Sequence, residues 1–333
     1  VCSCAPRDLI HRELTDKVFR CAPGRWTCYR CRNCRTVYLD PRPTAKTIGI
    51  AYKRYFTHSL GSDIGSRVSR IKKLRQTIAN GYRIRRFAMC PSPNSILSSW
   101  LSFLLPSKRA QWNADGRHLD RAMPGKCLLD VGCGNGDFLM FAQDMGWTVE
   151  GVDADKMAVQ VARSRGLTVH HGDIDVYGDE KECFDAITIA HVIEHVHDPV
   201  TLLAACYRLL KAGGMLWLET PNIDSVGHRI YGSNWRGLEP PRHLVLFNKD
   251  SLIFALRKAG FNLIEAPRPR RAALHSFARS EAISRYEDPC QSLRYPVRLR
   301  FRAWQADRYA ARDPSIGENL NLIARKLVAI DGS

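Results

Sequence analysis

The sequence predicts an α/β fold with a mostly parallel β-sheet, and three observations lead to this prediction. An apolar strand at 127–131 runs directly into a glycine-rich turn, and an apolar helix follows the turn. Two further strands are expected at 148–152 and 167–170. The 333 residues, of which 45% are hydrophobic and 25% charged, match an ordinary globular protein with room for about two domains.

This composition excludes several classes of protein. It does not fit a disordered chain, a collagen-like repeat or a small disulfide-framed scaffold. The longest apolar run, 96–105, has about half the length that a membrane-spanning helix needs, so we expect no such span. No secretory signal is visible, although the chain begins at Val1 without Met, and we expect a cytoplasmic protein.

The net charge of +17 is unevenly distributed. Residues 1–125 carry a net charge of +17, residues 126–266 carry −6, and residues 267–333 carry +6. Basic arms around a central block suggest a polyanionic partner, such as nucleic acid, anionic lipid headgroups or a phosphorylated substrate. Solubility alone is an equally good explanation.

Six of the twelve cysteines fall within the first 34 residues, which favours a metal site in a reducing compartment. Cys31 and Cys34 form a Cys-x2-Cys pair, and Cys2 and Cys4 supply a second pair that a hairpin would bring near the first. Four thiolates satisfy the tetrahedral preference of Zn²⁺. The sequence therefore predicts a zinc-binding module over residues 1–43, in which metal replaces much of a core. Free thiols are the alternative, and three other side chains are candidate ligands: Cys21, Cys28 and His11.

Two further regions follow this module. Residues 44–125 are expected to be a basic helical linker or cap, with a helix beginning within 46–56 and an amphipathic basic helix near 67–86. Residues 126–333 form the α/β domain. An Arg-rich insertion, 268–315, precedes its last strand.

The glycine-rich turn points to a ligand that contains adenosine. Gly132, Gly134 and Gly136 let the backbone turn sharply and approach a ligand closely. Their Gly-x-Gly-x-Gly spacing after Asp130 differs from the Gly-x-Gly-x-x-Gly of dinucleotide enzymes. The closer third glycine suits adenosine joined to an amino acid better than a pyrophosphate. Asp130 is placed to meet an ammonium group.

Two acidic residues after the next strands fit the same ligand. Asp153 ends the second strand, where a carboxylate can accept hydrogen bonds from a ribose diol. Asp173 and Ile174 follow the third strand, where an adenine amino group would find an acceptor. The full set of predicted binding residues is Asp130, Gly132, Cys133, Gly134, Gly136, Asp153, Ala154, Asp173, Ile174 and His191.

The segment 130–136, Asp153, Asp173 and the segment 184–199 together resemble class I S-adenosylmethionine-dependent methyltransferases. Further matches are Gly213-Gly214, 219–222 and 235–247. The resemblance is nearest to bacterial ubiquinone-type and sugar methyltransferases, and residues 31–43 resemble the zinc-bearing front end of part of that branch. It implies S-adenosylmethionine as cofactor and a Rossmann-like sheet of seven strands, with the last strand antiparallel. The strands are expected near 127–131, 148–152, 167–170, 185–190, 215–220, 262–266 and 319–325, with helices at 200–210 and 249–259.

Four residues are candidates for the chemistry at the acceptor: His191, Glu194, His195 and His243. The methyl donor becomes a neutral thioether when it loses its methyl group, so this leaving group needs no acid. A hydroxyl acceptor, however, needs a base to take its proton. Histidine suits that role because its pKa is near 6.5. We expect His195 to be the base, with Glu194 orienting it or holding an ion, and His243 as the second choice.

Two alternatives remain open for this group. His191 and His195 can serve only to pack and cap the following helix. Glu194 and His195 can instead bind a divalent ion, as the ubiquinone-type resemblance allows. His191 stands where those relatives often have a carboxylate, which weakens the metal interpretation.

The leading functional hypothesis is O-methylation of a glycan, a lipid-linked acceptor or a small molecule. The second is methylation of nucleic acid, such as RNA, which the charge and the cysteine pair suggest. It is disfavoured because Ala190–Val192 stands where amino methyltransferases have an Asn/Asp-Pro-Pro-aromatic signature. The third is a non-catalytic module that binds zinc and adenosine.

A basic segment near the end, Val297–Arg302, alternates apolar and basic residues, and Trp304 follows it. An extended chain would sort these residues onto two faces. Such a segment would be a strand or lid that packs on the core. Alternatively, it would dock peripherally on an anionic membrane, at the inner membrane of a bacterium.

Overall fold

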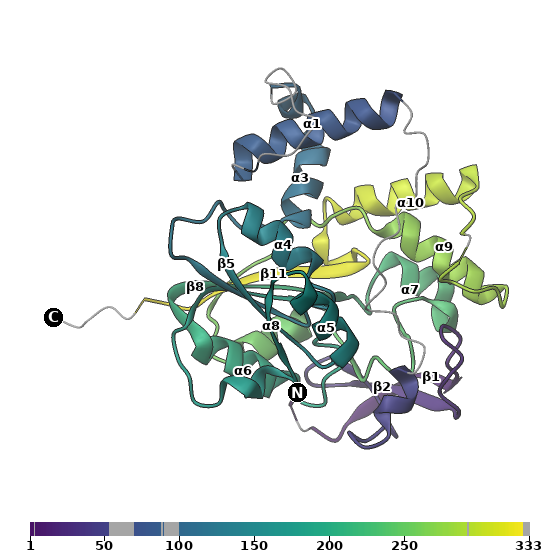
Figure 1. Ribbon diagram of the computed structural model, residues 1–333. Helices are drawn as coiled ribbons and strands as arrows, with labels where there is room; N and C mark the ends of the chain where they lie inside the picture. Colours follow the sequence, from purple (N-terminus) through teal and green to yellow (C-terminus); the bar gives the residue numbers. More distant parts are fainter. Residues whose placement is uncertain (3, 53–69, 88, 90–99, 292, 329–333) are drawn as a thin grey trace. The chain divides into compact units, whose positions relative to one another are not determined.

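The computed structural model describes residues 1–2, 4–52, 70–87, 89, 100–291 and 293–328 (Figure 1). The strands are β1 (Arg7–Leu14), β2 (Trp26–Cys31), β3 (Val37–Leu39), β4 (Cys127–Val131), β5 (Thr148–Asp153), β6 (Thr168–His171), β7 (Phe184–Ala190), β8 (Leu210–Pro221), β9 (Val245–Leu246), β10 (Leu263–Glu265) and β11 (Asn319–Arg325). The α-helices are α1 (Arg70–Phe87), α3 (Pro106–Asp115), α4 (Asp137–Asp144), α5 (Lys156–Ser164), α6 (Pro199–Leu209), α7 (Val226–Tyr231), α8 (Lys249–Lys258), α9 (Ala273–Ser284) and α10 (Val297–Ala310). Short 3-10 helices include η1 (Ile48–Tyr52) and η3 (Ile174–Tyr177).

The main sheet has seven strands in the order β10-β11-β8-β7-β4-β5-β6. Strands β4, β5 and β6 pair in parallel, whereas β10 and β11 pair antiparallel. The predicted α/β class, with a mostly parallel seven-stranded sheet, is confirmed. All seven expected strands are present, and the largest difference is at β8, which begins at Leu210 rather than near residue 215.

The chain divides into two compact units, each built from separate stretches of sequence. The first contains residues 1–55, 189–208 and 218–333, and the second contains 56–188 and 209–217. In the second unit, buried side chains of β4, α4 and β5 form one apolar cluster, with Leu128, Leu139 and Val149 among its members. This cluster anchors the strand that leads into the glycine-rich turn.

The amino-terminal segment forms a second sheet in the order β1-β2-β3-β9. Strands β1 and β2 are the expected hairpin, and β3 pairs with β9, which comes from a distant part of the chain. A real hydrophobic core lies on this sheet: Leu14, Trp26 and Val37 pack with Trp235 and Leu246. We expected metal to replace such a core, but residues 1–43 share one with the region around β9.

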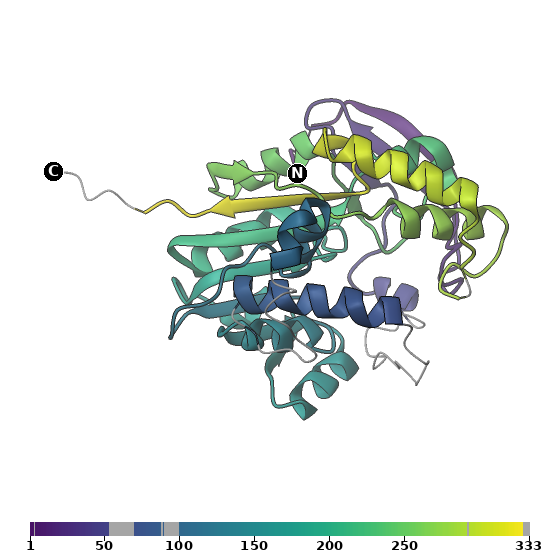
Figure 2. The ribbon, with the colours of Figure 1, turned by 90° about the horizontal axis from the view of Figure 1, so that it is seen from above.

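The segment Val297–Arg302 is helical, so the expected strand is wrong there. It forms the first turns of α10, which packs against α9 and lies beside it in Figures 1 and 2. The alternation of apolar and basic residues covered only six positions. Over fourteen residues, small and apolar side chains recur with the helical period, and these are the buried ones: Leu299, Ala303, Ala306 and Ala310.

The helices expected in the basic region are present in part. Residues 48–52 form the short η1, residues 46 and 47 lie in a turn before it, and residues 53–56 lie outside the described residues. Helix α1 covers most of 67–86, although 67–69 are likewise not described. Within the described part of the chain, every helix is too short or too polar to cross a bilayer.

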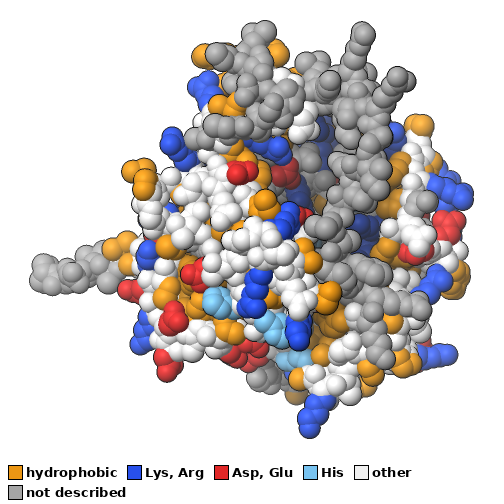
Figure 3. All heavy atoms as spheres, viewed as in Figure 1, with side chains coloured by type: hydrophobic (Ala, Val, Ile, Leu, Met, Phe, Trp, Pro, Cys, Tyr) orange, Lys and Arg blue, Asp and Glu red, His pale blue; other side chains and the backbone are white. Residues whose placement is uncertain are grey.

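Among the residues that the structure describes, the basic side chains form no single patch on the face drawn in Figure 3. Lys and Arg side chains there are interspersed with acidic and hydrophobic ones. That face therefore gives no support to a continuous basic surface for a polyanion.

Candidate functional site

The glycine-rich turn joins β4 to α4 in the second unit. Gly132, Gly134 and Gly136 have φ values of 73°, 54° and 83°, a backbone conformation that costs other residues strain. A side chain at Gly136 would also collide with Leu167, since an added Cβ would lie 2.3 Å from its Cδ1 atom. The backbone conformation therefore requires glycine at these positions. The amides of Gly132 and Gly136 donate to the carbonyl oxygens of Val152 and Cys133.

Asp153 is fixed beside this turn. Its Oδ2 atom accepts a hydrogen bond from the Gly134 amide at 2.8 Å, and Oδ1 accepts one from the Asp155 amide at 2.8 Å. Burial raises the pKa of Asp153, although these amides act in the opposite direction. The carboxylate is half-buried, and each oxygen keeps a lone pair for a further donor.

Asp130, at the end of β4, is buried and paired with Arg117. Its Oδ1 atom accepts hydrogen bonds from the Arg117 guanidinium and from the Thr188 hydroxyl, the latter at 2.8 Å. Its Oδ2 atom has no hydrogen-bond partner among the described residues. Burial raises the pKa of Asp130, and Arg117 opposes this shift. One acceptor atom of a buried carboxylate thus remains open.

The other predicted cofactor residues of this unit have distinct environments. The Asp173 carboxylate is exposed and accepts a hydrogen bond from the Asp175 amide at 3.0 Å, which begins η3, and Ile174 in that turn is buried. Ala154 is exposed next to Asp153. Cys133 is buried and packs closely against Gly151. A Cβ atom added to that glycine would lie only 2.6 Å from the Cys133 sulfur. Cys133 thus packs the turn onto β5.

A second group of predicted residues lies in the first unit, after β7. His191 follows this strand with φ of 55°, and its ring lies between two buried carboxylates. Its Nδ1 atom is 3.4 Å from Glu194 Oε1, and its Nε2 atom is 3.2 Å from Glu219 Oε1. Burial opposes protonation, but the two carboxylates outweigh it and raise the pKa of His191 to about 9. His191 is therefore a cation at neutral pH.

Glu194 is fully buried and ionised. Its Oε2 atom accepts a hydrogen bond from the Thr220 hydroxyl at 2.9 Å, and its Oε1 atom faces His191 Nδ1 at 3.4 Å. Burial opposes ionisation, but the interaction with the cationic His191 lowers the pKa of Glu194 to about 2.

The Nδ1 atoms of His195 and His243 both face backbone carbonyl oxygens. His195 Nδ1 lies 3.0 Å from the Arg242 carbonyl oxygen, and His243 Nδ1 lies 2.7 Å from the Gly237 carbonyl oxygen. Because a carbonyl only accepts, both Nδ1 atoms carry the proton and both Nε2 atoms have a free lone pair. Burial lowers the pKa of both histidines, so both are neutral.

These two histidines and Glu194 form one cluster. Ligand atoms of Glu194, His195 and His243 all lie within 4.8 Å of one another. The hydrogen bonds that orient the rings are of the kind that metal-binding histidines make with their second nitrogen. The structure therefore brings together three of the four predicted catalytic residues, with His191 against Glu194.

A buried ion-pair network holds the loop that carries His243. Arg242 is fully buried, and its guanidinium binds Asp16 at 2.7 Å and Glu239 at 2.8 Å. The same guanidinium donates to the Ala51 carbonyl oxygen at 2.9 Å. Since the Arg242 carbonyl accepts from His195, the network positions both histidines.

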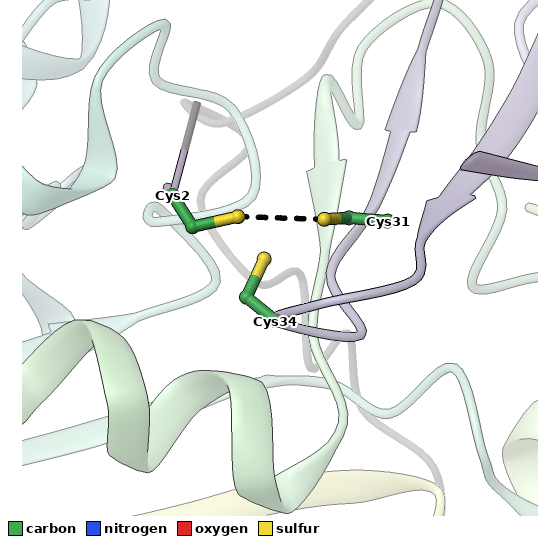
Figure 4. A group of neighbouring side chains, drawn as sticks. All are labelled: Cys2, Cys31 and Cys34. Carbon is green, nitrogen blue, oxygen red and sulfur yellow. Dashed lines mark hydrogen bonds between the residues drawn. The ribbon is translucent and has the colours of Figure 1, made fainter. Parts of the chain in front are cut away.

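Three of the predicted zinc ligands converge (Figure 4). The sulfur atoms of Cys2, Cys31 and Cys34 lie within 4.8 Å of one another, and the Cys2 and Cys31 sulfurs are 3.4 Å apart. Burial opposes ionisation of Cys2, but its hydrogen bonds, first with the Cys4 backbone, lower its pKa to about 6. Cys4 is exposed and 3.3 Å from the Asn33 amide nitrogen, outside this trio. The trio suits a thiolate-binding metal, and Cys4 as the fourth ligand remains a prediction.

The alternative zinc ligands are engaged elsewhere. Cys21 donates to Asp16 and to the Ala51 carbonyl, and Cys28 packs in the core of the amino-terminal sheet. His11 Nε2 lies 2.9 Å from His228 Nε2. None of the three joins the cysteine trio.

Several residues at these sites were not predicted. Arg117 and Glu219 are the partners of Asp130 and His191, and Arg270 donates to Glu219 at 2.7 Å. The Tyr52 hydroxyl lies 3.1 Å from His195 Nδ1. Because a buried carboxylate needs a cation, a buried Asp130 would indicate that a cationic partner exists. Nothing in the sequence indicates that Arg117 is that partner.

Comparison with known proteins gives a family match. The model of a family described as "Methyltransferase domain" matches residues 99–266. A ubiquinone biosynthesis O-methyltransferase of Thiobacillus denitrificans is 36% identical over 123 residues, which are 34% of this chain and 53% of that protein. The enzyme of the same name from Cereibacter sphaeroides is 33% identical over 163 residues, 45% of this chain and 66% of that protein. The matches thus span about half to two thirds of these relatives.

Solved structures with a similar chain are more distant. A SAM-dependent methyltransferase from Archaeoglobus fulgidus aligns over 67% of this chain and 93% of its own, with a TM-score of 0.45 and 20% identity.

Proposed function

Because this chain belongs to the methyltransferase domain family, we propose that it transfers a methyl group from S-adenosylmethionine to an oxygen atom of its acceptor. The observation that carries the proposal is the carboxylate of Asp153, fixed by backbone amides beside the glycine-rich turn. The printed names of the relatives, which are O-methyltransferases, support oxygen as the acceptor atom.

We assign the adenosine to the second unit. Asp153 accepts hydrogen bonds from the ribose diol, and the amides of Gly132 and Gly134 line the approach of the ligand. Asp173 and Ile174 take the adenine, the first as an acceptor and the second as an apolar contact.

The amino-acid end of the cofactor meets Asp130 and Arg117. The unpartnered Oδ2 atom of Asp130 supports binding of an ammonium group. The Arg117 guanidinium, which lies 3.5 Å over the Phe138 ring, can bind a carboxylate in addition to Asp130. The bound cofactor supplies a methyl group on a positively charged sulfur.

His195 is our proposed base. Its Nε2 lone pair is free because Nδ1–H donates to the Arg242 carbonyl, so Nε2 can take the proton of an acceptor hydroxyl. Glu194 stabilises the imidazolium that this proton transfer creates. His243 is the second choice, for the same tautomer reason.

A divalent cation held by Glu194, His195 and His243 is a second interpretation of the same cluster. The convergence of the Glu194 carboxylate with the Nε2 atoms of His195 and His243 favours it. Such an ion would polarise an acceptor oxygen and lower the pKa of its hydroxyl. The cationic ring of His191 beside Glu194 opposes it.

We further propose that Cys2, Cys31 and Cys34 hold a structural zinc ion, with Cys4 as fourth ligand. For the acceptor, we propose a small molecule with a hydroxyl group, either free, part of a glycan or attached to a lipid. The interspersed charges in Figure 3 give no reason to prefer nucleic acid.

Isothermal titration calorimetry tests the cofactor assignment. We expect S-adenosylmethionine, but not NADH, to bind the wild type, and Asp153→Ala to weaken binding at least tenfold, because a charged hydrogen-bond acceptor contributes about 1.5–3 kcal/mol. Asp144→Ala, which removes an exposed carboxylate of α4, is the matched control. Equal affinity in the wild type and Asp153→Ala would refute the assignment.

A further inference from the structure

Helix α10 carries an apolar stripe that core packing does not explain. The side of the helix formed by Leu299, Ala303, Ala306 and Ala310 is buried, and it packs against α9 (Figures 1 and 2). A helix that covers a core is normally polar on its opposite side. Here the opposite side is apolar.

Three residues make up this exposed stripe, which we call the α10 stripe: Val297, Phe301 and Trp304. They lie four and three positions apart, which places them on one side of a helix with 3.6 residues per turn. Their exposed fractions are 83%, 57% and 46%. Phe301 and Trp304 stack on each other, with ring centroids 5.8 Å apart.

Arginines border the α10 stripe on both sides. Arg298, Arg300 and Arg302 are exposed, and the Arg308 guanidinium lies 5.0 Å from the Trp304 ring centroid. None of these four side chains forms an ion pair with a carboxylate among residues that the structure describes. The one acidic residue of the helix, Asp307, instead accepts a hydrogen bond from the Ala273 amide at 3.2 Å.

From this arrangement we propose that α10 is a peripheral docking surface for an anionic lipid bilayer. A helix that lies flat in the headgroup layer inserts one apolar side and places basic side chains among the headgroups. Trp304 is the residue type most typical of that layer, and four unpaired arginines complement anionic headgroups.

A lipid surface fits this helix better than other occupants. The stripe is the outer side of a helix rather than a groove, and it includes aliphatic Val297. The rings of Phe301 and Trp304 lie against each other with their centroids 5.8 Å apart, so the stripe presents a continuous apolar surface and not a row of separate rings for stacking with the bases of single-stranded RNA. The proposal does not depend on methyl transfer.

Vesicle co-sedimentation of the full chain tests the proposal. We expect binding to phosphatidylcholine vesicles that contain phosphatidylglycerol, little binding to phosphatidylcholine alone, and loss of binding at high salt. Arg298→Ser/Arg300→Ser/Arg302→Ser should lower the partition coefficient by about fivefold per arginine. Phe301→Ser/Trp304→Ser should lower it by at least tenfold even though all arginines remain.

A matched control is Phe254→Ser, which removes an aromatic side chain of α8 that is 41% exposed. It should bind vesicles like the wild type. Circular dichroism and S-adenosylmethionine titration of each variant separate a loss of docking from a loss of folding or of the cofactor site. A wild type that ignores anionic vesicles at low salt would overturn the proposal. So would Phe301→Ser/Trp304→Ser that binds vesicles normally but has lost self-association or RNA binding.

Discussion

The charge of His191 makes the stability of the protein depend on pH. His191 lies beside the cluster of Glu194, His195 and His243, which we call the acceptor cluster. Its raised pKa means that the folded protein holds a proton more tightly than the unfolded chain does. The resulting stabilisation is fully present below the unfolded pKa of about 6.5 and is lost as the pH rises through about 9. The side chain is 41% exposed, so solvent screening reduces the effect.

We therefore expect His191→Gln to be less stable than the wild type at pH 6.5, by on the order of 1 kcal/mol, and equally stable near pH 10. Urea denaturation over this pH range measures the difference between the two proteins. The comparison cancels the titrating groups that do not interact with His191. Glu194 and His195 do interact with His191, so their pKa values change in the variant. A difference that does not change with pH would show that His191 is not a cation in the folded protein.

Substitution of His195 should distinguish a role as general base from a role in packing alone. We expect His195→Gln to lower kcat by roughly 10²–10⁴-fold with little change in cofactor affinity, because general base catalysis contributes about that factor. His275→Gln, which removes an exposed histidine of α9, is the control. Methyl transfer to a hydroxyl acceptor and calorimetry provide the two measurements. An unchanged kcat would mean that His195 only packs.

At the scale of elements, Arg242 ties the His243 loop to the amino-terminal segment. The guanidinium neutralises two buried carboxylates, and it holds the pKa of Asp16 well below its usual range against the effect of burial. Arg242→Met removes the cation from the buried Asp16 carboxylate, whereas Glu239 keeps its ion pair with Arg236. We expect a loss of about 3–5 kcal/mol in the free energy of unfolding, measured with urea. Arg32→Met, which breaks the exposed pair with Asp8, should cost less than about 1 kcal/mol.

The cysteine trio lies at one end of the hairpin of β1 and β2, because Cys2 precedes β1, Cys31 ends β2 and Cys34 follows it. Metal binding and the stability of the hairpin should therefore depend on each other. We expect about one zinc per chain by elemental analysis, and its loss in Cys31→Ser/Cys34→Ser. Because the hairpin also has an apolar core with Trp26 and Trp235, the variant should stay folded but unfold at a lower temperature. Cys183→Ser, outside the cluster, should keep the metal. Metal-free wild-type protein of unchanged stability would contradict the assignment.

Helix α10 shows why one element could not be predicted from its local pattern. Six residues that alternate apolar and basic fit a strand, and Val297 and Leu299 would then share a face. In the helix Leu299 is buried and Val297 is exposed. The first strand of the main sheet was predicted from its apolar run before the glycine-rich turn, whereas the count of seven strands followed from the resemblance to class I methyltransferases.

At the scale of the whole molecule, the two predicted sites differ in sequence separation. The residues of the proposed cofactor site are close together in sequence, whereas those that support the acceptor cluster are far apart. The turn and Asp153 come from consecutive strands, so a local motif indicated them. The cluster around Glu194 depends on Arg242, which binds Asp16, 226 positions away. Packing over such distances follows from the folded chain and leaves no local spacing to detect. Membership of the methyltransferase class was predicted from the local motifs and is confirmed by the family match.

The stability of the whole chain should depend on its cofactor. A ligand that binds only the folded state raises the free energy of unfolding by about 2.7 kcal/mol at a concentration of about 100 times its Kd. We expect S-adenosylmethionine to produce this increase in urea denaturation followed by circular dichroism, because its proposed contacts form only when β4 and β5 are paired. NADH should produce none. Asp153→Ala, which binds at least tenfold more weakly, should lose about half of the increase or more at the same S-adenosylmethionine concentration, whereas Asp144→Ala should retain it. An equal increase in Asp153→Ala would mean that the cofactor binds without this carboxylate, and that the glycine-rich turn holds it by other contacts.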